Sequence, residues 1–216
     1  MNYAALRVAV EDAVENTFTD ADFATMTKLA EQRIYNSVQF PALRRNQTAT
    51  LTQGNQYLSA PTDFLSVFSL AVISALGEYT FLLDKDVNFI RESFPSATTQ
   101  GVPKYYAIFG PRSNDPKELS FILGPTPNAY LGVELHYFYY PESIVTANNT
   151  WLSDNFDSAL FNAVMVEAAR WMKQEQDIVA MMDKEYVQSI ALLKNLGDGK
   201  NRQDAYRSGQ LRLPVK

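Results

Sequence analysis

Few residues in this sequence could do acid–base chemistry. Of its 216 residues only His136 is a histidine, and none is a cysteine. These counts exclude thiol nucleophiles, disulfides, cysteine-type zinc sites and any metal site that needs two histidines. The possible acid–base pairs are Glu134 with His136, and Asp154 with Asp157. Acids near a helix start usually cap the helix and a strand-face Glu is usually solvated, so we predict no catalytic residue and no enzyme.

One segment copies the opening of a calcium-binding loop, with Asp84, Asp86 and Asn88 at alternate positions. Such a loop needs a glycine at its sharp turn and a glutamate at its end. Phe89 and Pro95 occupy those two positions. We therefore predict an ordinary helix start here, with no metal site and no cofactor.

The charge balance argues against a protein that coats DNA. The chain has 19 Lys and Arg against 24 Asp and Glu, a net charge of −5, whereas duplex-binding proteins are usually basic. The sequence has no apolar run of about 18 residues, so we expect no membrane-spanning helix. The first seven residues lack the basic and apolar regions of a signal peptide. We expect a soluble protein made in the cytosol.

Helical periodicity marks both ends of the chain. Residues 3–40 predict two helices, the second beginning near Thr19 and presenting an apolar stripe formed by Phe23, Met26, Ala30 and Ile34. Residues 154–197 predict further helices, with either a corner between two helices or a register change within one at 173–176, and a stop at 197–199, where two glycines stand. The apolar stripes of residues 154–197 include Trp171 in one and Met181 in the other, and we expect both to face the core.

Residues 48–140 change to a period of two. Gly54 lies between two short strand-like runs and predicts a hairpin, and 84–94 predicts one short helix. In the last strand, Val133, Leu135 and Tyr137 share one face, while Glu134 and His136 share the other. No long helix separates the strands, which favours an antiparallel arrangement.

The fold class is therefore α+β: a helical bundle from both chain ends, with an inserted antiparallel β meander or small barrel, and an extended C-terminal tail. The expected parts are N-terminal helices at 1–47, a β-rich insertion at 48–142, C-terminal helices at 143–199 and a basic tail at 200–216.

The tail differs from the body in charge. Residues 200–216 carry a net charge of +4, against −9 for the other 199 residues. One interpretation is a solvated chain end. The other is a peptide that anchors the chain on a partner, because alternate apolar residues suit an added strand. The residues predicted to form this anchor are Arg202, Tyr206, Arg207, Leu211, Arg212, Leu213 and Val215.

Several segments, taken in order, resemble the head-to-tail adaptor (connector) proteins of tailed bacteriophages. They are AEQRI at 30–34, LR at 43–44, TATLTQG at 48–54, LSAPTDF at 58–64, GVPKYYA at 101–107, FILGPTP at 121–127, LHYFY at 135–139 followed by Pro141, NTWL at 149–152 and EAA at 167–169. The resemblance covers roughly residues 4–199. Gly124 departs from the polar or aromatic residue usual at that position of the family.

This resemblance implies a structural virion protein at the head–tail junction, assembled in the host cytoplasm. It implies a homo-oligomeric ring, commonly a dodecamer, that binds the portal protein above and a tail or nozzle protein below. Genomic DNA would pass through the ring without sequence-specific binding, and no membrane is involved. The residues fit this independently, because an acidic body suits a channel through which DNA slides.

Two other functions stay open. The tyrosines at 137, 139 and 140 could form a stacking platform in a carbohydrate- or receptor-binding β module of a tail. The helices at both chain ends would have no role in such a module. The other function is a hydrolase that uses paired carboxylates. It is supported only by acidic residues whose positions in space the sequence does not give.

Overall fold

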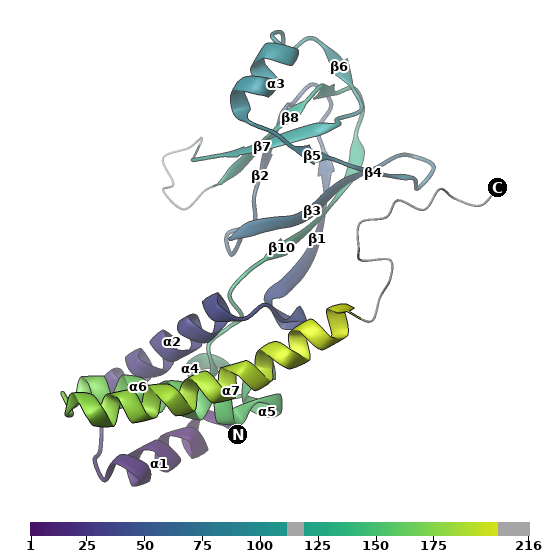
Figure 1. Ribbon diagram of the computed structural model, residues 1–216. Helices are drawn as coiled ribbons and strands as arrows, with labels where there is room; N and C mark the ends of the chain where they lie inside the picture. Colours follow the sequence, from purple (N-terminus) through teal and green to yellow (C-terminus); the bar gives the residue numbers. More distant parts are fainter. Residues whose placement is uncertain (112–118, 203–216) are drawn as a thin grey trace. The chain divides into compact units, whose positions relative to one another are not determined.

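The computed structural model describes residues 1–111 and 119–202 and confirms the α+β class (Figure 1). The chain divides into two compact units. We call Met1–Leu43 with Tyr140–Lys216 the helical unit, and Arg44–Tyr139 the β unit. The β unit starts at residue 44 because the first strand begins at Arg44 and is paired from that residue onward. No helix of the described residues is long and apolar enough to span a bilayer.

Two N-terminal helices form as predicted. They are α1 (Tyr3–Val14) and α2 (Asp20–Ser37), each begun by a capping side chain: Asn2 accepts from the N–H of Ala5, and Thr19 from that of Asp22. A short turn of 3₁₀ helix, η1 (Pro41–Leu43), follows α2. The predicted α2 stripe is confirmed, because Phe23, Met26, Ala30 and Ile34 are all fully buried.

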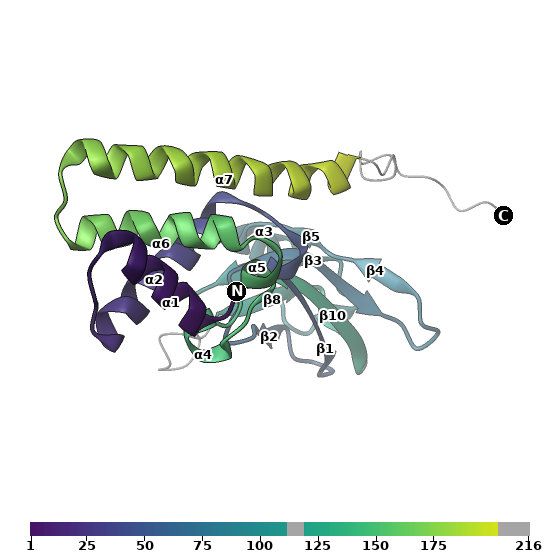
Figure 2. The same cartoon turned by 90° about the horizontal axis from the view of Figure 1, so that it is seen from below.

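The rest of the helical unit comes from the C-terminal part of the chain. Its helices are α4 (Ile144–Ala147), α5 (Trp151–Asn155), α6 (Asp157–Trp171) and α7 (Gln176–Arg202). Helix α6 lies at the centre, with α1, α2, α5 and α7 packed on it, and Figure 2 shows α6 between α1 and α7. The predicted corner at 173–176 is confirmed, and Lys173 takes a left-handed backbone there.

Three expectations about this region are wrong. Trp171 and Met181 are exposed rather than buried. Trp171 is the last residue of α6, and Met181 stands on a different side of α7 from the buried Tyr186, Ile190 and Leu193. The glycines at 197 and 199 do not stop α7, which continues to Arg202. Glycine keeps its backbone N–H and can adopt helical angles, so in a helix it costs only about 1 kcal/mol relative to alanine. The helix therefore includes the first three residues of the predicted tail.

In its described residues the β unit contains two four-stranded sheets and a two-stranded ribbon. We call the first sheet A, with order β1 (Arg44–Leu51), β10 (Leu131–Phe138), β3 (Ser66–Ile73) and β4 (Tyr79–Phe81). Sheet B has the order β2 (Tyr57–Ser59), β8 (Ser120–Gly124), β7 (Tyr105–Phe109) and β5 (Leu83–Asp84). The ribbon pairs β6 (Gln100–Gly101) with β9 (Thr126–Pro127).

The strand pairing corrects two expectations. The predicted hairpin around Gly54 is wrong, because β1 pairs with β10 and β2 pairs with β8. Gly54 does form a turn with positive φ, but this turn carries the chain from sheet A to sheet B. In addition, no barrel closes in the described residues, and β5–β7 and β6–β9 pair in parallel. Local residues were enough to predict the turn. The pairing partners of each strand are distant in sequence and are decided by the core that the paired strands bury together.

The core of the β unit lies between the inner faces of the two sheets. Val133, Leu135 and Tyr137 are buried, which confirms the predicted alternation in the last strand. Phe121 of sheet B is fully buried and contacts the rings of Phe64 and Tyr106. Helix α3 (Val87–Ser93) covers the other side of sheet B through Ile90 and falls within the predicted short helix.

The close approach of α3 explains why residue 124 is glycine. A Cβ built on Gly124 would lie 2.8 Å from Cδ2 of Phe94 and 3.0 Å from Cγ2 of Ile90. Cβ atoms in proteins essentially never approach another heavy atom as closely as the 2.8 Å to Phe94. Gly124 also precedes a cis peptide bond to Pro125. The packing of α3 on β8 therefore leaves no room for a larger residue at position 124, where the expected family pattern has a polar or aromatic one.

Candidate partner-binding surfaces

The lone histidine lies on the outer face of sheet A beside a serine and a glutamate. Oγ of Ser69 is 3.2 Å from Nδ1 of His136, and Oε1 of Glu134 is 3.8 Å from Nε2. The same Glu134 oxygen accepts a hydrogen bond of 2.5 Å from the side chain of Asn46. The structure thus brings together the three residue types of a catalytic triad, as well as the predicted Glu134–His136 pair.

The geometry of this group is that of a cross-strand ladder. These residues stand in register across three neighbouring strands, where Asn46 faces His136 and His136 faces Ser69. The distance between Glu134 and His136 exceeds that of a hydrogen bond, so the carboxylate does not orient the ring. The ladder is on the outer face, away from the core between the sheets. Such contacts stabilise a sheet face without concentrating a reacting group in a cleft.

The acids at helix starts have structural partners. The carboxylate of Asp86 accepts from the N–H of Asn88 at 2.7 Å and caps α3, which confirms the predicted helix start. Asp154 accepts from the side chain of Asn149 at 3.0 Å in the first turn of α5. Across the described residues, no three His, Asp or Glu side chains come together as a metal site would require.

The tyrosines at 137, 139 and 140 do not form a stacking platform. Tyr137 is fully buried, and its hydroxyl donates to Asp63 at 2.8 Å. Burial, together with that carboxylate, raises the pKa of Tyr137 to about 12. Tyr140 belongs to the helical unit, where its ring stacks on Tyr35 and its hydroxyl donates to Asn36. The buried position of Tyr137 removes the main support for a sugar-binding surface.

A buried carboxylate connects α2 to the start of α4. Glu31 is 2% exposed, and its Oε1 accepts from the N–H of Ile144 at 2.9 Å. Burial raises the pKa of Glu31, while hydrogen bonds from Ser143 and Ile144 and the charge of Lys28 oppose that rise. The carboxylate satisfies an N–H that the first turn of a helix leaves without an intrahelical acceptor.

Arg33, two residues further along α2, connects three helices. Its guanidinium lies 3.5 Å from Glu167 of α6 and 3.6 Å from Asp183 of α7. It also lies 5.1 Å from the ring centroid of Tyr186 on α7. Glu31, Arg33 and Glu167 belong to the segments on which the family resemblance rests, and the sequence alone assigned them no contacts. In the structure they hold the bundle together.

The helices α1 and α7 of the helical unit each expose several apolar side chains, while Leu29 of α2, Trp151 of α5 and Trp171 of α6 are exposed singly. On α1 these are Val8, with 58% of its surface exposed, and the neighbouring Ala4 and Ala5. On α7 they are Met181, Val187 and Leu192. Helix α6 lies between these two helices (Figure 2). Helical spacing places Met181 and Leu192 on one side of α7 and Val187 on another.

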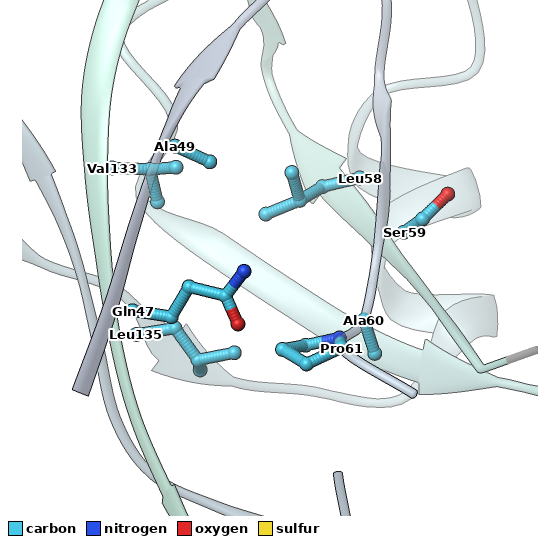
Figure 3. A pocket seen from close by; sticks show the side chains of 8 residues that line it. All are labelled: Gln47, Ala49, Leu58, Ser59, Ala60, Pro61, Val133 and Leu135. Atoms are coloured by element: carbon cyan, nitrogen blue, oxygen red, sulfur yellow. The ribbon is translucent and has the colours of Figure 1, made fainter. Parts of the chain in front are cut away.

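The β unit exposes apolar side chains on the hairpin formed by β3 and β4. Leu76 in its turn is 87% exposed, and Tyr79 and Phe81 on β4 are 53% and 63% exposed. At the other edge of sheet A, a pocket of about 120 Å³ lies beside β1. Its lining residues are Gln47, Ala49, Leu58, Ser59, Ala60, Pro61, Val133 and Leu135 (Figure 3). Neither surface was singled out from the sequence.

Of the predicted anchor residues, only Arg202 falls in the described part of the chain, as the last residue of α7. The other six lie outside the described residues: Tyr206, Arg207, Leu211, Arg212, Leu213 and Val215. The anchor therefore stays a prediction from the sequence.

Comparison with known families gives a match that covers nearly the whole chain. Residues 1–213 match the family described as SU10 adaptor protein. Among curated proteins, none matches the chain.

Proposed function

We propose, from the premise that this chain belongs to the SU10 adaptor protein family of phage head-to-tail adaptors, that it forms a ring joining the portal to the tail. Family membership makes it a structural adaptor of a phage virion, which contacts other head and tail components. A structural role also fits the ladder geometry around His136. The ring, its position at the head–tail junction and its partners are our proposal.

The observation that carries the proposal is the pair of exposed apolar faces on the helical unit. A cyclic ring needs heterologous contacts, in which one surface of a copy meets a different surface of the next. Helices α1 and α7 lie on either side of α6 (Figure 2), and their exposed apolar residues, around Val8 and around Leu192, differ in sequence. We propose that they meet between neighbouring copies and bury more than about 1,000 Å², as a persistent interface requires.

The charge distribution supports passage of DNA through the ring. The 199 residues before the basic end carry a net charge of −9. Acidic walls repel phosphates, so duplex DNA slides through such a channel without adhering. The channel lining is part of the proposal, as is a copy number near twelve.

The basic end of the chain supplies the proposed anchor. Arg202, Arg207 and Arg212 can pair with acidic groups of the portal or of a neighbouring copy. Leu211, Leu213 and Val215 alternate as an added strand or groove-bound peptide requires. Because part of this attachment is electrostatic, it should weaken as salt concentration rises.

The ring is tested by combining the full chain with portal and examining the product by electron microscopy. Val8→Asp and Leu192→Glu should each remove most rings, because each places a charge in an apolar contact. Ala13→Asp is the matched control, since Ala13 is also an exposed residue of α1 but stands on another side of that helix. Crosslinking that gave only isologous dimers would contradict the proposal.

The anchor is tested by ending the chain after Arg202, which keeps every described element. The melting temperature should stay nearly unchanged, while attachment to portal is lost. Lower salt should not restore attachment of the shortened chain. If the shortened chain joined portals as well as the full chain does, the anchor proposal would be wrong.

A further inference from the structure

Sheet A has two edges that are open to pairing within the described residues. Strand β1 pairs only with β10, and β4 pairs only with β3. Soluble proteins usually protect such edges with charged residues, prolines or bulges, because an open edge pairs readily with another strand. From Asn46 to Leu51 β1 has no charge and no proline, and the same is true of β4 from Tyr79 to Phe81.

The edges of sheet B combine short length with a charge or a proline, whereas β4 is short but has neither within its three residues, and β1 carries charge only at Arg44 and Arg45. Strand β5 has only two residues, one of them Asp84, and Lys85 follows it. Strand β2 has three residues and is followed by Pro61 after one intervening alanine. Within one unit, the edges of sheet A are therefore the less protected against pairing with another strand.

The two edges of sheet A are compatible with each other in direction. Every strand pair of this sheet is antiparallel, in the order β1, β10, β3, β4. Strand β4 therefore runs opposite to β1. When β4 of one copy is placed beside β1 of the next, the antiparallel alternation continues across the junction.

Side-chain directions also agree across such a junction. Thr80 faces Val72 in the β3–β4 register, and Val72 is a buried residue of the inner face. Gln47 and Ala49 face Leu135 and Val133, so they too stand on the inner face. They line the pocket of about 120 Å³, which opens between β1 and the segment 58–61 (Figure 3). A strand added to β1 directs one side chain in two toward this space, and Thr80 is small enough to enter it.

The remaining side chains of β4 suit the outer face. Tyr79 and Phe81 face Ile73 and Ala71, on the side of the sheet that carries Glu134 and His136. Beside β1 of another copy they would cover Thr48 and Thr50, whose partners in β10 are Glu134 and Gly132. Pairs of aromatic and β-branched residues across strands are favourable.

We propose that β4 of one copy pairs with β1 of the next, so that sheet A continues from copy to copy around the ring. This inference rests on the proposed ring, and it names a second copy of this chain as the partner of both edges. The contact is heterologous, as ring closure requires. A three-residue strand forms few hydrogen bonds, so this junction adds to the contact of the helical faces and does not replace it.

Engineered cysteines test the junction, because the natural chain has none. Two full-length double variants combine Thr80→Cys on β4 with either Gln47→Cys or Ala49→Cys on β1. In rings assembled with portal and then oxidised, at least one double variant should give a ladder of covalent oligomers of this chain. Each single variant should give none. The control pair Thr80→Cys with Thr48→Cys should also give none, because Thr48 stands on the outer face and disulfides need Cβ atoms about 4 Å apart.

A second variant tests the edge without new bonds. Thr80→Lys places a charge on β4 and should lower the yield of rings severalfold, while the control Thr25→Lys on an exposed position of α2 should not. Rings that form without any inner-face crosslink overturn this inference alone. So do crosslinks to portal or tail protein in place of a second copy. Absence of rings from the unmodified chain overturns the proposed function as well.

Discussion

The helical unit places a charged group inside its core, whereas the apolar cluster between the two sheets includes no charged side chain among the described residues. Glu31 is almost fully buried and accepts from Ile144, and Arg33 reaches both α6 and α7. In the β unit the interior between the sheets is apolar apart from the hydroxyls of Tyr106 and Tyr137. Glu134 and His136 stand on the outer face.

The difference follows from how each kind of element satisfies its backbone. Sheets pair their N–H and C=O groups with neighbouring strands, so their inner faces can be purely apolar. Each helix leaves its first N–H groups without acceptors inside the helix. A unit that joins α2 to the short helix α4 must supply an acceptor, and Glu31 does so. The β core should therefore be most sensitive to lost volume, and the helical core to a lost acceptor.

The largest effect is expected from Phe121→Ala, at the centre of the β core. Removing a fully buried phenylalanine side chain costs about 3–5 kcal/mol in free energy of unfolding. Hydrogen exchange should show the loss of protection in the peptides of residues 44–139, while α2 and α6 keep theirs. The control is Leu76→Ala, whose exposed side chain should change stability by less than about 0.5 kcal/mol. Equal loss of protection in both units would show that they do not unfold separately.

A smaller effect is expected from Gly124→Ala, which adds volume to the same unit. The new methyl group would meet Phe94 and Ile90 and force them to shift, at a cost of about 1–3 kcal/mol. Gly110→Ala is the matched control, because no atom lies within 4 Å of a Cβ placed there. Chemical denaturation of the two variants measures the difference. If both were equally stable, α3 would not be packed on β8 as tightly as described.

In the helical unit, Glu31→Ala removes the acceptor for a buried N–H. Leaving such a group without a partner costs about 1–3 kcal/mol. Glu31→Gln keeps an oxygen in the same place and should recover most of that loss. The unfolding free energies of the two variants distinguish the effect of losing the hydrogen-bond acceptor from the effect of losing the negative charge. Equal stability of the alanine and glutamine variants would contradict the role given to the hydrogen bond.

The same residue gives a pH dependence with a defined sign. The pKa of Glu31 in the folded chain is raised above its ordinary value of 4.5. Folding therefore favours the protonated group, and this stabilisation is present below pH 4.5 and lost as pH rises through the raised value. As pH rises through that range, wild type should lose stability and Glu31→Gln should not, so the variant gains stability relative to wild type. Chemical denaturation at several pH values measures this difference. A constant difference would show that burial does not raise this pKa.

The smallest effect is expected from His136→Ala. The ring contacts Ser69 and lies near Glu134 on an exposed face, so its loss should cost less than about 0.5 kcal/mol. Virion assembly should proceed normally. A hydrolytic activity of the purified chain that disappeared with this variant would instead make the Ser69, His136 and Glu134 group a catalytic site.

Local patterns predicted individual elements well and their partners poorly. The stripe from Phe23 to Ile34 and the alternation in β10 follow from burial of one face, which is a property of each segment. The pairing of β1 with β10 joins residues about 90 positions apart, and the turn at Gly54 gives no sign of it. The contacts of Glu31 and Arg33 were missed for the same reason, since their partners come from distant helices.

The sequence by itself determined the α+β class, the positions of most helices and strands, the absence of thiol chemistry and the resemblance to phage adaptors. Periodicity, composition and ordered segments are all carried by the chain without reference to its fold. Only the tertiary structure decided which strands form the edges of sheet A, which glycine α3 requires, and where Glu31 finds its donor. Those properties depend on segments far apart in the chain, and distance in sequence does not record distance in space.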